Sequence, residues 1–358
     1  MQKLCFVLLL LTGFLSRSIH AQVIINGRVL DSLSHEPMPL ASVFCQNTTV
    51  GTATNKAGEF KLELKSGGYD LVVSYTGYQT QIVRITGTEK GLLEILMTKQ
   101  DKSLSEVIVR NSNEVKGGWE KYGDFFIENF IGSSADAREC KLLNKEALKF
   151  FYYNRSNKLK VLATEPLQIE NKALGYSLHY QLDSFVYYYN SDINSYRGFC
   201  LFTEMIGTDS EKKAWVSNRL MAYYGSKLHF MRSIYDSSLE EEGWEIAMLN
   251  ENDDTKFSKV VNPYDTLYYA TLDSSHQTEI WFPRKISITY TKGKPEQEYL
   301  KKYELPANVG VQISYVNLLD AILIRENGYY FDQKNWITQG YWGWKNIGDQ
   351  LPYDYRPD

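Results

Sequence analysis

The strongest hint of metal chemistry in this sequence is His276, which stands three residues before Glu279. A His-x-x-Glu spacing begins the zinc site of some peptidases, but such a site also needs a third protein ligand and a catalytic glutamate. No histidine follows His276 in the chain. We therefore interpret residues 276–279 as a polar turn before a strand, and we predict no metal site there.

The other histidines between residues 100 and 275 are His179 and His229. Neither has a second histidine at the four-residue spacing of a His-Glu-x-x-His motif, so we expect solvated or hydrogen-bonded side chains. The sequence also contains no Gly-x-Ser-x-Gly nucleophile turn and no glycine-rich phosphate-binding loop. We predict no catalytic residue, no cofactor-binding residue, no metal ligand and no cofactor.

Acidic side chains gather at residues 240–242, which are three consecutive glutamates. We interpret them as a solvated helix end, although negative charge at the C-terminus of a helix opposes its dipole and suggests a basic partner such as Arg232 or Arg219. Paired carboxylates for glycoside hydrolysis are positioned by the fold and have no local spacing. A hydrolase with an unrecognised carboxylate site therefore stays open.

The sequence is rich in aromatic residues, with 27 tyrosines, 16 phenylalanines and 7 tryptophans. Adjacent residues of a strand point to opposite faces, so a tyrosine doublet leaves one ring on each face and half of such rings exposed. Exposed rings suit stacking on a glycan or contact with a protein. A second interpretation, in which tyrosine merely covers a sheet, stays open. The runs are Tyr152-Tyr153, Tyr187-Tyr188-Tyr189, Tyr223-Tyr224, Tyr268-Tyr269 and Tyr329-Tyr330.

A helix and a sheet are predicted between residues 119 and 204. Residues 119–131 place Trp119, Phe126 and Phe130 at helical spacing, which predicts a helix that packs one face inward. Residues 147–204 contain runs of β-branched and aromatic residues separated by turn formers. These runs predict an antiparallel sheet with one side on a core.

The strongest helical pattern covers residues 211–242. Gly225 interrupts it, and Ser226 can cap a second helix by accepting a hydrogen bond from a backbone N–H of the first turn. Asn327-Gly328 predicts a hairpin with a type I′ turn. Residues 119–358 therefore predict an α+β domain with an antiparallel sheet. Its later strand patterns fall at residues 266–272, 279–290, 311–315 and 319–332.

Short strand patterns fill residues 22–98. Runs at residues 41–44, 60–64 and 71–75 alternate apolar and polar positions, and glycine, asparagine or aspartate stands at each break. This punctuation, repeated over about seven short strands, predicts an all-β sandwich.

A set of positions in this segment carries a family resemblance. The positions are Gly27, Val29, Asp31, Pro39-Leu40, Ala41, Val43, Gly51-Thr52, Thr54-Asn55, Gly58, Phe60, Leu62 and Ser74-Tyr75-Thr76-Gly77-Tyr78. They resemble the carboxypeptidase-regulatory-like domain, a transthyretin-like sandwich at the N-terminus of many exported proteins of Bacteroidota, including TonB-dependent receptors. The resemblance implies an accessory module and no peptidase activity, because this module lies beside the catalytic domain in metallocarboxypeptidases.

Two further segments carry weaker resemblances. Residues 104–109 resemble the connector that follows the sandwich in such receptors. Parts of the later region, including residues 166–171 and 225–233, resemble uncharacterised Bacteroidota exported proteins that carry the same sandwich. Neither resemblance implies an activity.

A secretory leader is predicted at the start of the chain. Lys3 gives a short positive segment, residues 4–15 are apolar, and Ala21 precedes the expected cleavage site. A retained membrane anchor is the alternative, but about 12 apolar residues are fewer than the roughly 20 that span a bilayer. We expect an exported protein of the periplasm, the outer membrane or the cell surface. The expected division is a signal peptide at 1–22, a β-sandwich at 23–99, a connector at 100–118 and an α+β domain at 119–358.

Charge and cysteine content restrict the remaining possibilities. The net charge of −4 and the absence of a Lys/Arg block argue against nucleic-acid binding. No later stretch is apolar over the roughly 18 residues of a transmembrane helix. Cys45 ends an apolar run and is expected to be a buried free thiol. A bridge between Cys140 and Cys200 stays open, because spacing alone does not establish one.

Together these patterns predict a non-catalytic binding or assembly protein of the cell envelope. The β-sandwich is an accessory module in this interpretation, and exposed aromatic side chains contact an envelope protein or a glycan. Two alternatives stay open. One is an envelope hydrolase with an unrecognised carboxylate site, and the other is a component related to TonB-dependent outer-membrane systems.

Overall fold

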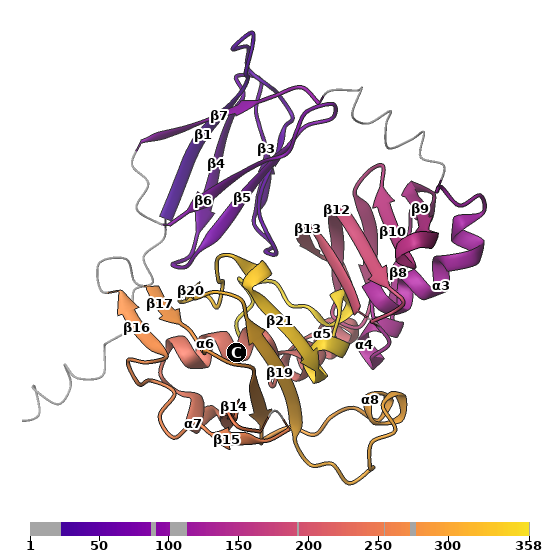
Figure 1. Cartoon of the computed structure of the whole chain (residues 1–358). Helices are drawn as coiled ribbons and strands as arrows, with labels where there is room; N and C mark the ends of the chain where they lie inside the picture. Colours follow the sequence, from indigo (N-terminus) through magenta and orange to yellow (C-terminus); the bar gives the residue numbers. More distant parts are fainter. Residues whose placement is uncertain are drawn as a thin grey trace, which may run out of the picture.

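The computed structural model describes residues 23–86, 91–100, 113–191, 193–253, 255–272 and 277–357. The predicted leader, residues 101–112 of the predicted connector, and His276 lie outside the described residues. Figure 1 shows three groups of strands: an N-terminal group at the top, a sheet with helices beside it at the right, and orange to yellow strands below.

The N-terminal group is a sandwich of two sheets. One sheet has the order β4-β1-β7, with β1 and β7 parallel, and the other has the order β3-β2-β5-β6. The buried side chains between the sheets include Val29, Val43 and Leu71. This arrangement confirms the predicted all-β N-terminal region. The strands are β1 (Val23–Asp31), β2 (Ser42–Cys45), β3 (Gly51–Ala53), β4 (Glu59–Leu64), β5 (Tyr69–Ser74), β6 (Gln81–Ile85) and β7 (Leu92–Met97).

Strand β4 shows why the sequence pattern predicts this sandwich. Phe60, Leu62 and Leu64 are buried, and the residues that alternate with them are exposed, as expected for one face of a sheet on a core. The turn before β4 is likewise formed by residues that are close together in the sequence. Gly58 has a φ of 74°, and the Asn55 Oδ1 accepts two backbone N–H groups at 2.9 Å.

The second group is a six-stranded antiparallel sheet with helix α3 on one face. The order is β8-β11-β12-β10-β9, and β13 pairs with β12. Phe126 and Phe130 of α3 are fully buried, and Phe126 contacts the rings of Phe150 and Phe185. The predicted helix and antiparallel sheet are therefore confirmed. The elements are α3 (Gly118–Phe130), α4 (Ala135–Arg138), β8 (Cys140–Leu142), η1 (Lys145–Ala147), β9 (Leu148–Tyr153), η2 (Asn154–Ser156), β10 (Lys158–Ala163), β11 (Leu167–Asn171), β12 (Tyr176–Tyr188) and β13 (Ile193–Glu204).

The helical pattern at residues 211–242 forms three helices. Gly225, with a φ of 82°, turns the chain after the first helix, and the Ser226 side chain accepts the His229 N–H and caps the second, as predicted. The second break was not predicted. It includes Ser237, which has a φ of 56°, an uncommon conformation for a residue with a side chain. The helices are α5 (Asp209–Tyr223), α6 (Lys227–Tyr235) and α7 (Leu239–Glu242).

The third group contains two antiparallel sheets. One has the order β15-β14-β18-β19-β21, and the other has the order β16-β17-β20. The predicted strand at residues 279–290 is split between them at Pro283, which lacks a backbone N–H and cannot continue the ladder. The elements are β14 (Trp244–Leu249), β15 (Phe257–Lys259), β16 (Tyr269–Leu272), β17 (Gln277–Ile280), β18 (Ile286–Tyr290), α8 (Gln297–Lys302), β19 (Gln312–Leu318), β20 (Ile322–Ile324), η3 (Gln333–Asn335), β21 (Trp336–Gly340), α9 (Tyr341–Trp344) and η4 (Ile347–Asp349).

The hairpin predicted at Asn327-Gly328 forms, but its turn is not type I′. The Arg325 N–H donates to the Tyr329 carbonyl at 2.8 Å, and Gly328 has a φ of 80°. Asn327 does not share this positive φ, which a type I′ turn requires of both central residues. Its side chain instead bonds the β-sandwich: Oδ1 accepts from the Gly68 N–H at 3.1 Å, and Nδ2 donates to the Gly68 carbonyl at 3.0 Å.

The bridge that the sequence left open between Cys140 and Cys200 does not form, because both cysteines are free. Cys140 lies on β8 and Cys200 on β13, and the strands β11 and β12 separate them. Adjacent strands are about 4.8 Å apart, so the two Cα atoms are about 14 Å apart, beyond the roughly 7 Å that a disulfide spans. Cys45 is a buried free thiol, as predicted.

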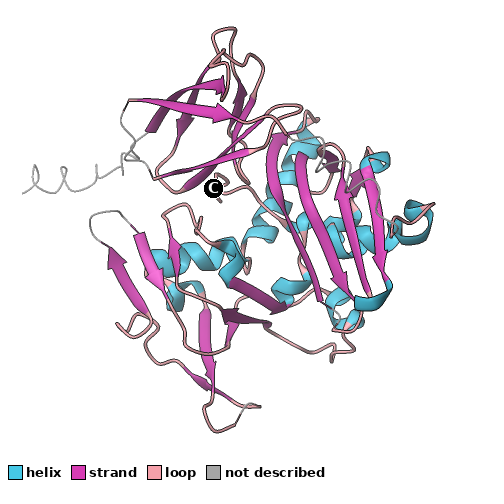
Figure 2. Cartoon of the chain, turned by 45° about the horizontal axis from the view of Figure 1, so that its top comes forward, coloured by secondary structure: helices cyan, strands magenta, loops and turns pink. Residues whose placement is uncertain are grey.

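The C-terminal tail runs between the β-sandwich and the later sheets, where Figure 2 shows the end of the chain. The Tyr353 N–H donates to the Asn47 carbonyl at 2.8 Å, and the Asn47 N–H donates to the Cys200 carbonyl at 2.7 Å. The Thr49 N–H donates to Asp354 Oδ1 at 2.9 Å. The turn between β2 and β3 is therefore held by the tail on one side and by β13 on the other.

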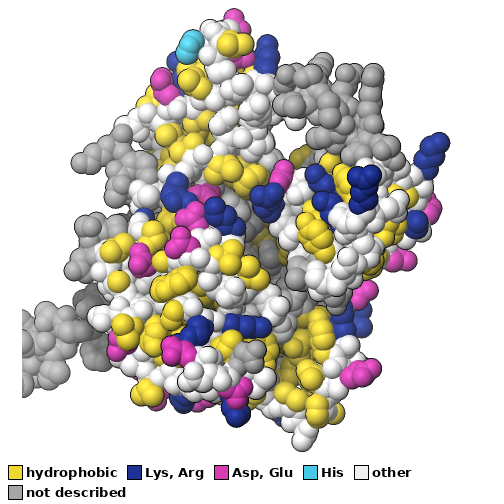
Figure 3. All heavy atoms as spheres, in the orientation of Figure 1, with side chains coloured by type: hydrophobic (Ala, Val, Ile, Leu, Met, Phe, Trp, Pro, Cys, Tyr) yellow, Lys and Arg dark blue, Asp and Glu magenta, His cyan; other side chains and the backbone are white. Residues whose placement is uncertain are grey.

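Charged side chains mark a second contact between the β-sandwich and the third group. The Arg84 guanidinium lies 4.1 Å from the centre of the Phe331 ring and 3.8 Å from Asp332 Oδ1. Figure 3 shows basic and acidic side chains next to one another along the boundary between the two groups. Such a contact combines charge attraction with contact between the cation and the aromatic ring.

Candidate functional site

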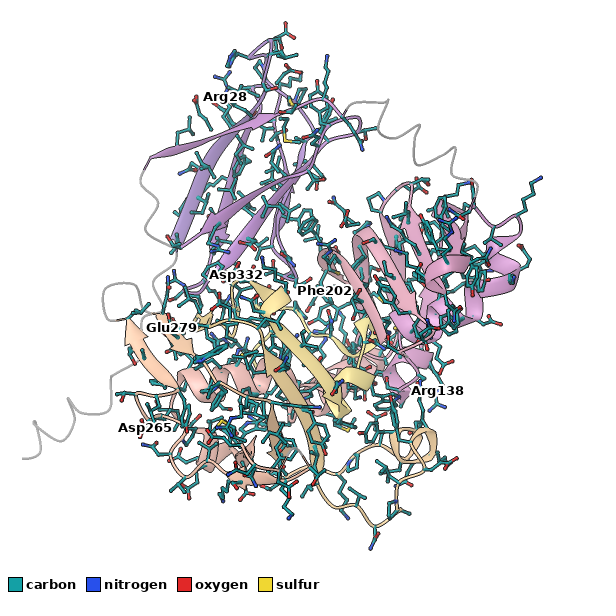
Figure 4. All side chains as sticks on the ribbon, viewed as in Figure 1. Arg28, Arg138, Phe202, Asp265, Glu279 and Asp332 are labelled. Carbon is teal, nitrogen blue, oxygen red and sulfur yellow. The ribbon has the colours of Figure 1, made fainter. Side chains whose placement is uncertain are left out.

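Of the two residues considered for a zinc site, only Glu279 lies among the described residues. Glu279 is half-buried on β17, opposite Ala270 and Leu323 of the neighbouring strands. Figure 4 shows Glu279 and Arg138 on opposite sides of the later region. His179 is exposed on β12. Among the described residues, no group of three or more His, Cys, Asp or Glu side chains could hold a metal ion.

His229 is buried and supports the break between α5 and α6. Its Nδ1 accepts the Gly225 N–H at 3.2 Å, so Nε2 carries the proton and donates to Glu242 Oε2 at 3.0 Å. Burial lowers the pKa of His229, and the Glu242 carboxylate opposes only part of that shift. His229 is therefore a hydrogen-bonded core histidine, as the sequence predicted.

The predicted partner of the acidic run at residues 240–242 is wrong. Glu242 bonds His229, whereas Arg219 bonds Glu204 Oε1 at 2.9 Å. Arg232 is buried and donates to backbone carbonyls, including that of Tyr353 at 2.9 Å. Both arginines are turned away from α7 because they hold other segments of the chain in place.

A cavity of about 490 Å³ lies where the three groups of strands meet. Asn47 lines it from the β-sandwich, Asp136 from α4, Ser226 from the start of α6 and Trp342 from α9. Sites for small ligands are typically about 300 to 1,000 Å³ and combine apolar walls with a few polar groups. The cavity has this size and composition, and we treat it as the candidate binding site.

Part of the cavity wall carries three carboxylates and one ammonium that influence one another, and we call it the acidic end: Asp136, Glu296, Asp349 and Lys345. Lys345 Nζ donates to Asp349 Oδ1 at 2.8 Å and to Glu296 Oε1. Asp349 is only 8% exposed, which raises its pKa. Its Oδ1 also accepts the Ser134 hydroxyl at 2.6 Å, but its Oδ2 has no hydrogen-bond partner among the described residues.

Asp136 differs from the other carboxylates at this end. It is half-buried, and within the described part of the chain its carboxylate has no ion pair and no hydrogen bond. Burial raises the pKa of Asp136 to about 6, and the negative charge of Asp349 adds to the shift. Glu298, which also lines the cavity, is instead paired with Arg138 at 2.5 Å.

Aromatic side chains also line the cavity. Tyr330 and Trp342 line it, and the Trp342 Nε1–H donates to the Gly225 carbonyl at 2.7 Å. Lys227 Nζ donates to the Tyr330 hydroxyl at 3.1 Å. Gln312 lines the same cavity, and its Oε1 has no hydrogen-bond partner in the described structure. The cavity thus combines aromatic rings with polar side chains.

Exposed aromatic side chains are present on the surface, as the sequence predicted. On β12, Tyr187 is buried and Tyr188 is 41% exposed, which is the alternation expected for a strand. Tyr329 and Tyr330 lie in two different core clusters and are both buried, so this doublet does not expose the one ring that was expected. They lie in a hairpin covered on two sides, and the Tyr329 hydroxyl donates to Asp70 of the β-sandwich at 2.5 Å.

A group of half-buried rings lies where α3 meets the end of the six-stranded sheet, and we call it the outer aromatic cluster: Tyr122, Phe125, Tyr152 and Tyr189. The Tyr122 and Tyr152 rings are stacked with centroids 6.2 Å apart, and those of Phe125 and Tyr189 are 5.6 Å apart. Partly exposed rings of this kind offer area for contact with a partner.

The residues of the acidic end were not predicted from the sequence. Asp136, Glu296 and Asp349 are far apart in the chain and show no shared spacing. Asp136 and Asp349 meet because η4 packs against α4, whose N-cap residue Ser134 donates its hydroxyl to Asp349 Oδ1 at 2.6 Å. Glu296 is joined to Asp349 through Lys345, which bonds both carboxylates. No signal in the sequence marks these particular carboxylates, because carboxylate pairs are positioned by the fold and have no local spacing.

Comparison with known proteins identifies the N-terminal part of the chain. The family model of the CarboxypepD_reg-like domain matches residues 25–109. The chain is 32% identical over 114 residues to TonB-dependent receptor P39 of Formosa agariphila, and 32% identical over 111 residues to TonB-dependent receptor SusC of Bacteroides thetaiotaomicron. These matches cover 32% and 31% of this chain but only 11% of each receptor. The predicted resemblance of the sandwich is confirmed.

Similarity to solved structures is weak. A Bacteroides fragilis protein described as membrane-associated and of unknown function aligns over 87% of this chain and 99% of that chain, with 10% identity and a TM-score of 0.18. A 9R-lipoxygenase from Cyanothece aligns over 62% of this chain and 49% of that chain, with 8% identity and a TM-score of 0.17. Scores this low support no inference. No helix in the described ranges is long and apolar enough to cross a membrane.

Proposed function

We propose that this chain, in which a CarboxypepD_reg-like domain precedes an α+β region, is a non-catalytic binding or assembly protein of the bacterial cell envelope. The β-sandwich is an accessory module. The cavity holds the ligand, which is part of an envelope protein or a glycan, and the outer aromatic cluster adds contact area.

The observation that carries this proposal is the position of the cavity among all three groups of strands. Asn47 reaches it from the β-sandwich, Asp136 from the side of the six-stranded sheet and Trp342 from the third group. A ligand bound there contacts each group and stabilises their arrangement, because a ligand that binds only the assembled state shifts the equilibrium toward it. This coupling suits a protein that assembles with another component.

Two further observations support the envelope location. Residues 1–22 have the composition of a secretory leader. The CarboxypepD_reg-like domain is homologous to part of two TonB-dependent receptors. The proposal therefore includes a role related to TonB-dependent systems. The proposed division remains a leader at 1–22, a β-sandwich at 23–99, a connector at 100–118 and an α+β domain at 119–358.

A capture experiment tests the proposal. The tagged mature chain is incubated with envelope extract, and the retained proteins and glycans are identified by mass spectrometry. The variant Met221→Trp carries a large ring at the edge of the cavity, on a residue that is 67% exposed, so the fold should tolerate it. We expect it to retain about tenfold less of the specific partner.

The matched control is Val216→Trp, on the same helix and 57% exposed but outside the cavity. It should retain as much partner as the unchanged chain. If both tryptophan variants capture the partner equally well, the cavity is not the binding site. If the unchanged chain retains no specific component, the proposed function itself is wrong.

A second candidate function is an envelope hydrolase, and one observation favours it. Asp136 has a pKa of about 6 beside the negative charge of Asp349, and a carboxyl group with a raised pKa can act as a general acid near neutral pH. Turnover of envelope glycans or peptides by the purified chain, abolished in Asp136→Asn, would replace the binding proposal with this one.

A further inference from the structure

We propose that the acidic end of the cavity binds a protonated primary amine of the ligand. This inference rests on the proposed function, because it names the chemical group that the cavity recognises. The ammonium can belong to a peptide, as an amino terminus or a lysine side chain, or to an amino sugar. Both sources present the same charged donor, and the experiment below separates them.

The charge of the acidic end is the first reason. Glu296 and Asp349 pair with Lys345, and Asp136 adds a third carboxylate to the same end of the cavity, so these four side chains carry a net charge of about −2 when all three carboxylates are ionised. The nearby Arg138 is already paired with Glu298 at 2.5 Å. Charges that are removed from water are costly unless an opposite charge pairs with them. A ligand cation would supply that charge.

Unused hydrogen-bond acceptors are the second reason. Asp349 is more than nine-tenths buried, and its Oδ2 has no partner within the described residues. The Asp136 carboxylate is likewise unpaired, although it lines the same cavity. An alkylammonium group has three donors and no acceptor, so it can bond several carboxylate oxygens at once.

The geometry favours an ammonium over a metal ion. No group of ligating side chains in the described ranges could hold a metal ion. An ammonium needs no fixed coordination shell, and its rotatable donors can reach oxygens on separate elements. The Tyr341 ring also lines the cavity beside the acidic end, with its centroid 5.7 Å from Lys345 Nζ, and a cation near an aromatic face gains further stabilisation.

Binding of an amine should also depend on pH. The groups that face Asp136 are Asp349 and Glu296, which raise its pKa, and Lys345, which lowers it, and burial brings the pKa to about 6. Cys140 packs nearby, and burial raises the pKa of its thiol, so it stays neutral. Between pH 5 and pH 7 Asp136 therefore gains its charge, and affinity for an ammonium should rise.

Two matched pairs of probes test the inference by isothermal titration calorimetry on the full mature chain. One pair is the dipeptide alanyl-tyrosine and its N-acetyl form, and the other is glucosamine and N-acetylglucosamine. In each pair acetylation removes the charge and keeps the rest of the molecule similar. We expect one free amine to bind about tenfold or more tightly than its acetylated form at pH 7. The pair that shows the difference identifies the source of the amine.

The variant Asp136→Asn should abolish both the preference for the amine and its rise between pH 5 and pH 7. The side chain is half-buried and has no partner in the described part of the chain, so the variant should fold, which circular dichroism can verify. The control is Glu298→Gln, which lies in the same cavity but whose carboxylate is already paired with Arg138. This control should keep the preference.

Equal binding of the free and acetylated probes, or a preference that survives in Asp136→Asn, would overturn the inference. Absence of binding by all four probes would also overturn it. None of these results tests the proposed function, which the capture experiment with Met221→Trp tests independently. A captured envelope partner that is lost in Met221→Trp but lacks any free amine would leave the function standing and reject only the amine.

Discussion

His229 shows how burial controls the charge of a single residue. The rings of Tyr223, Tyr224 and Trp244 surround it, with centroids 5.0, 5.2 and 5.3 Å from the imidazole. An imidazolium there would lose its hydration, so the pKa of His229 falls even though Glu242 accepts its Nε2–H. The neutral ring is the form that joins α5, α6 and α7.

This lowered pKa predicts a loss of stability in acid. Because the pKa of His229 in the folded chain lies below its ordinary value of 6.5, the unfolded chain takes up a proton at higher pH. The stabilisation from the neutral ring is complete above pH 6.5 and declines as the pH falls toward the folded-state pKa. Between pH 7 and pH 5, the free energy of unfolding measured in urea should fall less in His229→Gln than in the unchanged chain. His179→Gln, at an exposed site, should behave like the unchanged chain, and identical pH dependence in all three would contradict the prediction.

Single residues also show what the sequence could and could not predict. Ser226 and Cys45 were correctly interpreted, because a helix cap and an apolar strand leave local signals. Asp136 and Asp349 were not identified, because their proximity exists only after α4 and η4 have packed together. Chemistry that depends on tertiary contact has no local spacing to detect.

At the scale of elements, the cap of α6 can be tested directly. The Ser226 Oγ accepts the His229 N–H at 3.1 Å and satisfies a donor that the helix itself cannot. Ser226→Ala should lower the free energy of unfolding by about 1 kcal/mol, as measured by urea denaturation. Ser226→Asn keeps a capping oxygen and should recover most of that loss. A variant with asparagine no more stable than the one with alanine would mean that the cap contributes nothing.

Elements were predicted well where one local rule determined them. The alternation in β4 and the helical spacing of α3 identified both elements and their buried faces. Residues 279–290 looked like one strand, because its apolar pattern continues through Pro283, yet the two halves join different sheets. Asn327-Gly328 predicted the hairpin correctly but the turn type wrongly: Asn327 lacks the positive φ of a type I′ turn, and its side chain bonds both Gly68 and the Tyr329 N–H.

At the scale of the whole molecule, the β-sandwich is held by residues that no sequence pattern connects. Its β2–β3 turn contacts the tail through Thr49 and Asp354, and its β4–β5 turn contacts the hairpin through Gly68 and Asn327. The sequence predicted the fold of each region, but it could not predict these contacts, because they join residues about 260 to 305 positions apart. The cavity lies between the same regions, so its shape depends on them.

Asn327 therefore offers a test of how firmly the β-sandwich is attached. Asn327 is 2% exposed, and its side chain bonds the N–H and the carbonyl of Gly68 and the N–H of Tyr329, so Asn327→Ala removes the partner of three buried polar groups. The free energy of unfolding should fall by about 2 to 3 kcal/mol. Hydrogen exchange should become faster at the Gly68 amide and in the hairpin, while exchange in β10 and β12 stays unchanged. Asn26→Ala, on the exposed face of β1, is the control and should alter neither quantity. Faster exchange spread evenly over all three groups of strands would show that the molecule unfolds as a single unit, and that this contact is not a separate attachment of the β-sandwich.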